Sequence, residues 1–430
     1  MKIHPISDPS LWNKYMRQCR ETDFQQTWEY GEGVERCAGW KPLRQLVLDD
    51  QTPVALVQTL TKTLPIVGPA ARMQNGPMFF DYSKEVPPNR AMEALRCLTS
   101  YWTKEKESAL HLTPCLLPED LPSDWISNLR LYESKEPFWN SIRIDLSIEA
   151  DALRRNMRRT GWREPLRKAE RLGLQTVWSQ SDADFDFLLT QYRQAQREKG
   201  FSWPSADLVQ VLWDRAKDSF QIVWIENEER RLAGMALFTF VDTSYCLIAW
   251  NGPSSRETHA ANLIFWQSIL YFQQRNYRWL DLGGIDPVNL PGITEFKRGM
   301  GGQEYRWAGG AESISPAARR NFEEAERQDE IPYVIPGFAS APFQLDKLDD
   351  VQNRVESLVA DFVRDLSGMN VSIDRHESLI NSGLIDSLSI VSLVQTLQEA
   401  FDIEIAPFEL TIENFDTPER IASFVKEKSR

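Results

Sequence analysis

The sequence is poor in the side chains that bind metals or form disulfides. Its 430 residues include five cysteines and four histidines, and no two cysteines form a C-x-x-C pair. An odd number of widely separated cysteines argues against a disulfide framework, and the scattered histidines argue against a metal site. We therefore expect reduced, mostly structural cysteines and no bound metal. The residues are Cys19, Cys37, Cys97, Cys115, Cys246, His4, His111, His259 and His376.

Long apolar runs are also absent. The sequence contains no stretch of about 18 consecutive apolar residues, the length that a membrane span requires. The first eight residues contain no apolar segment of the kind found in signal peptides. We therefore predict neither a secretion signal nor a membrane span, and expect a cytoplasmic protein.

Positive charge is in deficit. The chain has 49 basic and 62 acidic residues, a net charge of −13, which argues against a protein that binds nucleic acid over its whole surface. The deficit is uneven, because residues 345–430 contain 17 acidic and 8 basic residues, a net charge of −9, and the first 344 residues carry −4. The sequence thus predicts a nearly neutral body followed by an acidic C-terminal domain.

One window of the body is strongly basic. Between Asp151 and Leu174 there are eight basic residues and three acidic ones. Such a run is usually the solvated face of a helix. Clustered guanidinium groups would also suit a ligand that carries phosphates. Both interpretations remain open.

Short apolar segments and longer amphipathic segments alternate along the body in two similar rounds. The first kind predicts strands and the second predicts helices. The simplest fold class is α/β, with two lobes of similar construction. Predicted strands are 43–48, 54–60, 142–146, 175–178, 221–225, 234–240, 245–250 and 279–282, and predicted helices are 90–106, 185–200, 206–216 and 260–276.

These patterns divide the chain into four parts. The first lobe is predicted over 1–150, and the second lobe, with the basic window, over 151–329. Residues 330–345 contain three prolines and no periodicity, which is typical of a semi-rigid linker. Residues 346–430 contain amphipathic segments over 351–366, 387–401 and 418–428, typical of a small helical bundle.

The C-terminal domain contains Asp386-Ser387-Leu388 directly after Gly383-Leu-Ile, at the start of a predicted helix. An Asp-Ser pair alone could be an ordinary helix cap. In this helical context the motif resembles the attachment site of acyl and peptidyl carrier proteins. The resemblance implies a four-helix bundle in which Ser387, preceded by Asp386, carries 4′-phosphopantetheine. It also implies a phosphopantetheinyl transferase as a partner. At a helix N-terminus the phosphate would lie near free backbone N–H groups.

Five phrases of the body, in the same order along about residues 20–310, resemble the Fem-type aminoacyltransferases. That family transfers an amino acid from aminoacyl-tRNA to an amine, and its members contain two lobes of the GNAT-type N-acyltransferase fold. The resemblance therefore implies two tandem GNAT-type lobes ahead of the carrier domain. The phrases are Phe24-Gln-Gln-Thr-Trp-Glu-Tyr-Gly, Gly39-Trp, Asn75-Gly-Pro, Trp162-Arg-Glu-Pro-Leu-Arg-Lys-Ala-Glu-Arg-Leu-Gly, and Asp281-Leu-Gly-Gly-Ile-Asp with Phe296-Lys-Arg-Gly-Met-Gly-Gly.

Two departures from related proteins concern the donor. Enzymes of the larger fold hold the pyrophosphate of coenzyme A with a glycine-rich loop, but residues 256–262 contain no glycine. Free acyl-CoA is therefore a less favoured donor. The second lobe also lacks the long charged helical hairpin with which some Fem proteins bind tRNA. The basic window is then the expected tRNA contact, with Arg158, Arg159, Arg163 and Lys168 as candidates.

The resemblance also implies catalytic residues. Lys297 matches a family lysine near the reacting carbonyl, where a fixed cation would stabilise the developing oxyanion. Phe296, directly before it, is a candidate substrate contact. Asp281 and Asp286 are candidate acceptors of the amine proton, although both could instead cap a turn.

Two further residues match the acceptor groove of the family, Arg197 and Tyr245. The family threonine two places before the arginine is Ala195 here, which argues against a peptidoglycan nucleotide as acceptor. No Ser-His-Asp or Cys-His constellation is visible, so we expect no covalent catalysis by the body.

We therefore predict an enzyme that forms an amide bond in natural-product biosynthesis. It would join an amino acid from aminoacyl-tRNA to the amine of a substrate tethered to Ser387, and tethering would raise the local acceptor concentration to about millimolar. Two alternatives remain open. The carrier could supply the acyl donor to a free amine without tRNA, or an inactive body could present the carrier to its loading and downstream enzymes.

Overall fold

The computed structural model describes residues 1–64, 68–80, 88–134, 140–199, 204–228, 230–287 and 290–313, together with a subset of residues between 352 and 428. Contacts divide the chain into two compact units. The first unit, called the body below, contains residues 1–62, 71–106 and 110–313, and the second unit contains the C-terminal helices. The predicted linker over 330–345 lies outside the described residues.

The first sheet of the body has the strand order β1-β2-β3-β4-β6-β15-β7, and β5 pairs with β3. Successive residues of a strand point to opposite faces. Leu46 therefore lies in one core cluster with Trp12 of α1 (Pro9–Met16), whereas Val47 lies in another with Leu95 of α3 (Pro88–Ser100). The strands are β1 (Lys2–Pro5), β2 (Lys41–Asp49), β3 (Thr52–Leu64), β4 (Gly68–Met73), β5 (Met78–Phe79), β6 (Ala109–Leu112), β7 (Tyr132–Glu133) and β15 (Ala311–Glu312).

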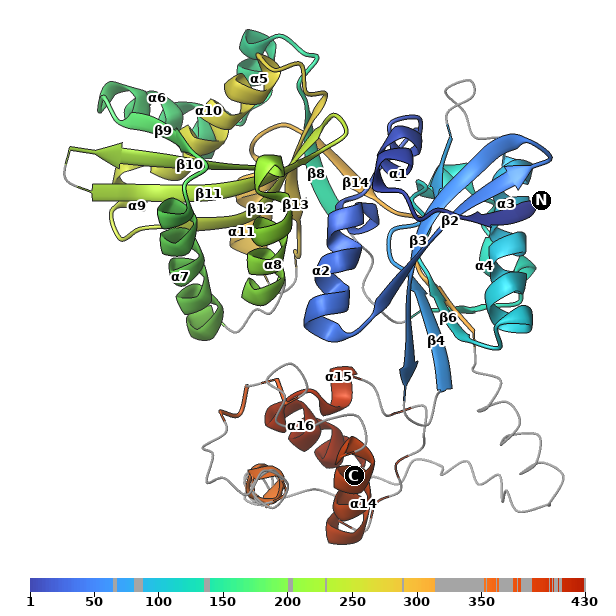
Figure 1. The fold of residues 1–430 in the computed structure, drawn as a ribbon. Coiled ribbons are helices and arrows are strands. Elements are labelled where there is room, and N and C mark those ends of the chain that lie inside the picture. The colour runs from blue at the N-terminus through green and yellow to red at the C-terminus, as the bar shows by residue number, and fades with distance from the viewer. Residues whose placement is uncertain are drawn as a thin grey trace, which may run out of the picture. The chain divides into compact units, whose positions relative to one another are not determined.

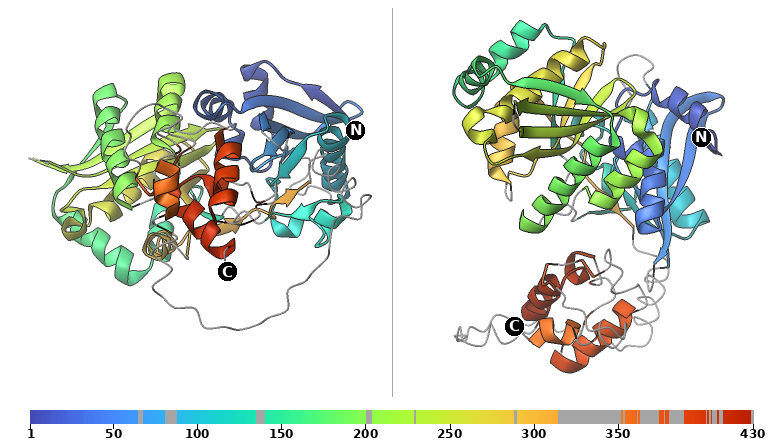
Figure 2. Two further views of the ribbon diagram at one scale, coloured as in Figure 1. Left: turned by 90° about the horizontal axis from the view of Figure 1, so that it is seen from below. Right: turned by 60° about the vertical axis from the view of Figure 1, so that its left-hand side comes forward.

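The second sheet has the strand order β14-β8-β13-β12-β11-β10-β9. Helices α6 (Glu164–Arg171) and α10 (Ala260–Gln273) cover one face, and α7 (Asp182–Lys199) and α8 (Ala206–Ala216) cover the other (Figure 1 and Figure 2). The strands are β8 (Asn140–Asp145), β9 (Gln175–Ser179), β10 (Phe220–Asn227), β11 (Arg230–Phe240), β12 (Thr243–Asn251), β13 (Trp279–Gly284) and β14 (Gln303–Arg306).

The two sheets exchange strands across the predicted lobe boundary at residue 150. The predicted first lobe includes residues 140–145. These residues form β8, which pairs with β13 and β14 of the second sheet. Conversely, β15 follows the second sheet in the chain and pairs with β6 and β7 of the first sheet. Apolar periodicity shows that a segment is a strand and does not show its partners, because pairing depends on contacts distant in sequence.

The lobes, meaning each sheet with its helices, share a hydrophobic core. Helix α2 (Trp28–Ala38) of the first lobe packs against α8 of the second. Phe24 and Tyr30 lie in one core cluster with Leu208 and other apolar residues of the second lobe. A Cβ at Gly33 would lie only 2.7 Å from Leu208 Cδ1, so the helices approach where a side chain is missing. Residues from both lobes can therefore line one rigid site.

The second unit is a small helical assembly. Its helices are α14 (Ser389–Phe401), α15 (Ile412–Phe415) and α16 (Pro418–Lys428), and residues 354–360 are also helical. Val355, Leu393, Leu397 and Val425 lie in its buried core. The bounds of α16 are those predicted from the amphipathic pattern.

The described residues contain neither a membrane-spanning helix nor a metal-binding cluster. Among them, no helix has the length and apolar character needed to cross a bilayer. The same residues contain no group of three or more His, Cys, Asp or Glu side chains placed to hold a metal ion.

Candidate active site

The pairing of β12 with β13 ends in the middle of the second sheet. These strands run parallel and pair from Thr243 with Trp279 to Tyr245 with Asp281. A bulge follows in β13, where Gly283 has a φ of +75°. A Cβ at this residue would lie 3.0 Å from the carbonyl oxygen of Cys246, so a glycine permits both the left-handed backbone and the close approach of β12.

Lys297 binds to this bulge. Its ammonium group donates hydrogen bonds to the carbonyl oxygens of Gly283, at 3.1 Å, and Gly284, at 2.7 Å. Burial lowers the pKa of the ammonium, and the charges of Cys246 and Asp281 act in the opposite direction. Because an ammonium has three N–H groups and the carbonyls accept two hydrogen bonds, one donor remains for a ligand.

Lys297 is held in place by the turn that contains Trp162. Helix α11 (Pro291–Arg298) carries the lysine, and the indole N–H of Trp162 donates a 2.6 Å hydrogen bond to the carbonyl oxygen of Phe296. The ring of Phe296 packs against Trp162 at a centroid distance of 4.6 Å and against Phe265 at 5.8 Å. The structure therefore places Phe296 against core aromatics, where it positions Lys297.

Tyr245 lies on the other side of the bulge. Its ring stacks on Phe24 of the first lobe, with a centroid distance of 5.0 Å and an interplanar angle of 2°. The Tyr245 hydroxyl oxygen and Lys297 Nζ each lie 3.7 Å from the position that a Cβ of residue 283 would occupy. Two of the predicted site residues thus flank the same backbone bulge.

Asp281 is buried at the foot of the bulge, with 6% of its surface exposed. Its Oδ1 accepts hydrogen bonds from the hydroxyl of Ser141 (2.6 Å) and the backbone N–H of Gly283 (2.8 Å), and its Oδ2 accepts one from the hydroxyl of Tyr305 (2.6 Å). Burial raises the pKa of this carboxyl despite these donors. The carboxyl fixes the Gly283 backbone and, through it, the carbonyl that binds Lys297.

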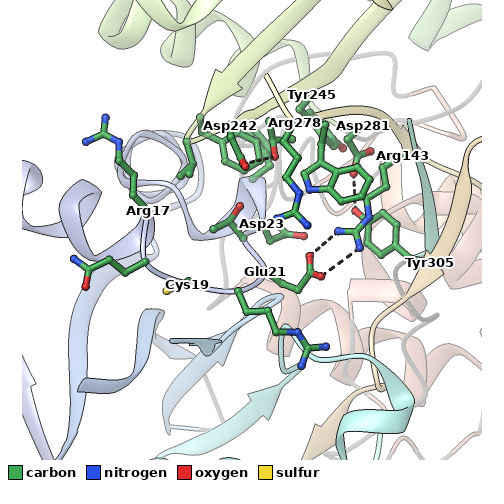
Figure 3. Close-up of a pocket in the computed structure, with 18 residues that line it drawn as sticks. Arg17, Cys19, Glu21, Asp23, Arg143, Asp242, Tyr245, Arg278, Asp281 and Tyr305 are labelled. Carbon is green, nitrogen blue, oxygen red and sulfur yellow. Dashed lines mark hydrogen bonds and ion pairs between the residues drawn. The ribbon is translucent and has the colours of Figure 1, made fainter. Parts of the chain in front are cut away.

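A cavity of about 310 Å³ lies next to Tyr245 and Asp281, between the two lobes (Figure 3). Residues 17–24 of the first lobe form one wall, and the starts of β12 and β13 form the other. Arg143 pairs with Glu21 at 2.6 Å and lies over the ring of Trp279, with its guanidinium carbon 4.1 Å from the ring centroid. The cavity is thus lined by both acidic and basic side chains.

Asp23 is the buried acid on the first-lobe wall of this cavity, with 6% of its surface exposed. It accepts hydrogen bonds from the backbone N–H of Gln25 (2.8 Å) and the indole N–H of Trp307 (3.2 Å). Burial raises the pKa of Asp23 to about 6, and the charge of Asp281 contributes to the rise, while these hydrogen bonds oppose it. A raised carboxyl pKa beside a cavity is a common property of functional sites.

The raised pKa of Asp23 predicts a dependence of stability on pH. Because the folded chain binds this proton more tightly than the unfolded chain, the contribution of Asp23 to the free energy of unfolding is largest below its ordinary pKa of 3.8 and falls as the pH rises through about 6. The loss should be about 1–3 kcal/mol. Asp23→Asn should therefore gain stability relative to wild type as the pH rises from 3.8 through about 6.

Urea unfolding followed by tryptophan fluorescence measures this change in the body alone, because all 15 tryptophans precede residue 308. A difference in unfolding free energy between the two proteins that stays constant with pH would contradict a raised pKa of Asp23.

Two family models match the chain. Residues 155–298 match the acetyltransferase (GNAT) domain, and residues 357–425 match the phosphopantetheine attachment site. The C-terminal segment is 37% identical over 68 residues to the D-alanyl carrier protein of Lactobacillus acidophilus and covers 86% of that protein, or 16% of this chain. It is 33% identical over 79 residues to D-alanyl carrier protein 1 of Lactiplantibacillus plantarum, covering 94% of that protein and 18% of this chain. The chain is a GNAT-fold acyltransferase fused to a member of the phosphopantetheine carrier protein family.

The whole body also matches a solved structure. The crystal structure of FemX has a TM-score of 0.62 and 15% identity to this chain, and the match covers 75% of this chain and 100% of FemX. At this identity the likeness concerns the fold. It confirms the predicted α/β fold class with two tandem GNAT-type lobes ahead of the carrier domain.

The carrier domain implies a covalently bound 4′-phosphopantetheine. Ser387 and Asp386 lie outside the described residues. The sequence places Ser387 two residues before the first residue of α14, Ser389. A serine hydroxyl at this point is the group required to form the phosphodiester, so the residues present fit the cofactor.

Tyr245 and Asp281 line the cavity, whereas the other predicted site residues of the acyltransferase, Lys297 and Phe296 included, do not. Asp286 lies on the segment after β13, where its backbone N–H donates a 3.1 Å hydrogen bond to the hydroxyl of Thr294. Arg197 lies exposed near the end of α7. In the basic window, Arg158 pairs with Glu295 at 2.7 Å and Arg159 with Glu164 at 3.1 Å. For Arg163 and Lys168, we find no acidic side-chain partner among the described residues.

Four residues of the site were missed by sequence reasoning: Asp23, Ser141, Arg143 and Tyr305. Of these four, Asp23 could have been proposed from the sequence, because it directly precedes the Phe24 phrase. Ser141 and Arg143 lie on β8, and Tyr305 lies on β14, so they reach Asp281 only through the pairing of these edge strands.

Proposed function

We propose that the body transfers the aminoacyl group of an aminoacyl-tRNA to the amine of an amino-acid-derived substrate held on Ser387, in natural-product biosynthesis. The observation that carries this proposal is the position of Lys297 Nζ on the bulge where β12 and β13 separate. The fold of FemX supports it, and so do the names of the D-alanyl carrier relatives, which connect this kind of carrier with an amino acid.

Lys297 can stabilise the charge that develops in this reaction. When an amine attacks an ester carbonyl, the carbonyl oxygen becomes negative, and a fixed donor in a dry site stabilises it. The third N–H of Lys297 is available for that oxygen, while the carbonyls of Gly283 and Gly284 hold the other two. A C–N bond forms, the C–O bond to the ribose breaks, the amine loses a proton, and the ribose oxygen gains one.

4′-Phosphopantetheine would supply the thiol that holds the acceptor as a thioester. The remaining requirement is orientation, since an ester and an amine held in contact react without further covalent chemistry by the protein. The stacked pair of Phe24 and Tyr245 and the hydrogen-bonded Asp281 give the proposed site a rigid wall.

The segment before α10 supports a donor other than free acyl-CoA. His259 has a φ of +54° directly before the first residue of the helix, Ala260, and its side chain makes no capping hydrogen bond. Neither residue is a glycine that would let a pyrophosphate approach the backbone closely. Lys168 lies near enough to lower the pKa of His259, after the larger effect of burial. Lys168 and Arg163 are therefore the side chains that we propose for contact with tRNA phosphates.

The proposal is tested by loading the carrier and supplying charged tRNA. The chain is loaded from alanyl-CoA by a phosphopantetheinyl transferase that accepts acyl-CoA, and is then incubated with aminoacyl-tRNA. Intact mass spectrometry should show the mass of one added aminoacyl group. Ribonuclease treatment of the tRNA beforehand should abolish the gain. A loaded chain that gains no mass with a complete set of charged tRNAs would contradict the proposal.

A second candidate reverses the direction of transfer. The group on Ser387 would be the donor, and a free amine the acceptor. The ion pairs of Arg158 and Arg159 favour it, because they reduce the positive charge available to a nucleic acid. Loss of the alanyl group from the carrier to an added amine, unaffected by ribonuclease, would support this candidate.

A further inference from the structure

The cavity between the lobes is lined by two buried acids, and the cations that act on one of them, Lys297 and Arg143 on Asp281, form no ion pair with it among the described residues. Asp23 and Asp281 each have 6% of their surface exposed, and each lines the cavity. Among the described residues, neither carboxyl forms an ion pair. Their hydrogen-bond donors are uncharged: two backbone N–H groups, two hydroxyls, an indole and the side chain of Asn75.

The basic residues of the same cavity are arranged differently. Arg20 is held by Asp120 in a bidentate pair at 2.8 and 2.9 Å, and Arg143 is held by Glu21 at 2.6 Å. Arg278 extends from the second lobe into the cavity, while Arg17 points away from it (Figure 3). Arg143 and Arg20 are thus each paired with another carboxylate, although the charges of Arg143 and Asp281 also interact.

Two buried carboxyls that face one cavity repel each other when ionised, and each raises the free energy of the other's charged form. A cation that enters the cavity relieves this repulsion and gains two charge-assisted hydrogen bonds. A primary ammonium fits because it is small and has several N–H donors. A guanidinium is larger, and a metal ion would need more oxygen ligands than two carboxyls supply.

We propose that this cavity binds the protonated amine of the acceptor, with Asp23 and Asp281 as its two carboxyl partners. The inference rests on the proposed function, in which an amine is the nucleophile. It adds the subsite that selects the amine and assigns Asp23 to it.

The position of the cavity agrees with this role. Asp281 forms part of the cavity wall. It also accepts a hydrogen bond from the backbone N–H of Gly283, whose carbonyl oxygen accepts one from Lys297. Tyr245 lines the cavity, and its hydroxyl lies beside the same bulge. An amine held by the acids is thus next to the residues that face the reacting carbonyl. Asp23 is the carboxyl that would take the ammonium proton before attack.

The ammonium could belong to a free amino acid or to an aminoacyl group on the carrier. These sources differ in one charge, since a free amino acid keeps its carboxylate and an aminoacyl thioester does not. Arg278 is the residue that would bind a carboxylate. Its guanidinium has no acidic partner among the residues that the structure describes, and it lies over the ring of Trp279 at 5.0 Å.

The test is a binding measurement on the full chain by saturation-transfer NMR. The probes are D-alaninamide, which has an ammonium and no carboxylate, D-alanine, which has both, and propionamide, which has neither. Saturable binding of D-alaninamide and none of propionamide is expected. Asp23→Asn should weaken D-alaninamide binding about 10- to 100-fold, the effect of one hydrogen bond to a charged group. Asp124→Asn, an exposed acid of the first lobe, is the matched control and should bind as wild type does.

Arg278→Gln separates the two sources. If a free amino acid is the ligand, the substitution should weaken D-alanine binding more than D-alaninamide binding; if the carrier supplies the amine, it should change both affinities equally. Equal binding of propionamide and D-alaninamide, equal affinity of wild type and Asp23→Asn, or no saturable binding in the millimolar range would each overturn the inference.

If amine binding fails while transfer from tRNA persists, only this inference is lost. If the amine binds and no aminoacyl group is transferred, the proposed function is lost instead.

Discussion

Ser387→Ala is expected to abolish loading of the chain completely. Without the hydroxyl there is no atom to which the phosphate of 4′-phosphopantetheine can be attached, so incubation with a phosphopantetheinyl transferase and coenzyme A should leave the intact mass unchanged. The substitution removes a single oxygen from the carrier domain, and the body should retain its urea unfolding midpoint. Under the proposed function, transfer from aminoacyl-tRNA to the chain should be lost as well.

The matched control is Ser389→Ala, two residues later at the start of α14. It also removes one hydroxyl, and it should be loaded to completion. A Ser387→Ala chain that still gains the mass of one phosphopantetheine would show that the attachment residue is another one. Failure of both variants would point to an altered helix rather than a lost attachment atom, and circular dichroism of the two would distinguish these cases.

Lys297→Met should lower kcat about 10²- to 10³-fold with a small change in KM. Removing one donor that contacts the oxyanion typically has this effect, because the interaction is made mainly in the transition state. Methionine replaces the aliphatic part of the side chain at similar volume and loses the charge and the donors. The two glycine carbonyls would also lose their partner, so the variant should unfold at a lower urea concentration. The rate of aminoacyl transfer to the loaded chain is the quantity to measure.

The control for this variant is Arg298→Met at the next residue of α11. Arg298 pairs with Glu304 at 2.9 Å and Glu295 at 3.2 Å on the surface. Exposed pairs of this kind contribute little to stability, and kcat should stay within about two-fold of wild type. A Lys297→Met variant that changes only KM would assign the lysine to substrate binding. A fully active variant would show that Lys297 does not stabilise the transition state.

Much of the fold follows from local patterns. Alternating apolar residues marked strands of both lobes, and the apolar face of residues 418–428 gave the bounds of α16 because a surface helix must bury one stripe of its side chains. The site was only partly predictable. Lys297, Tyr245 and Asp281 were found through phrases shared with a family. Asp23 was not, because its raised pKa comes from burial in the folded chain, where even its hydrogen-bond donor Trp307 is 284 residues away in sequence.

The register of the edge strands could not be predicted from the sequence either. Ser141 and Tyr305 are ordinary residues in the sequence, and they become partners of Asp281 only because β8 pairs with both β13 and β14. Arg197 and Asp286 show the opposite case, in which the sequence predicts a role for residues that lie outside the cavity. Both residues match a family position, yet the structure leaves them outside the cavity. Their roles therefore stay predictions.

The return of β15 to the first sheet limits how this protein can be modified by recombination. Residues Ala311–Glu312 pair on both sides, with β6 and with β7, so they fill a gap inside the sheet. A genetic exchange that joins the first lobe of one enzyme to the second lobe of another must also exchange this distant segment, or the hybrid sheet is left with unpaired backbone groups. A junction after Ser313 leaves both sheets intact. Replacing the carrier domain is therefore the simpler way to give this acyltransferase a new substrate supply.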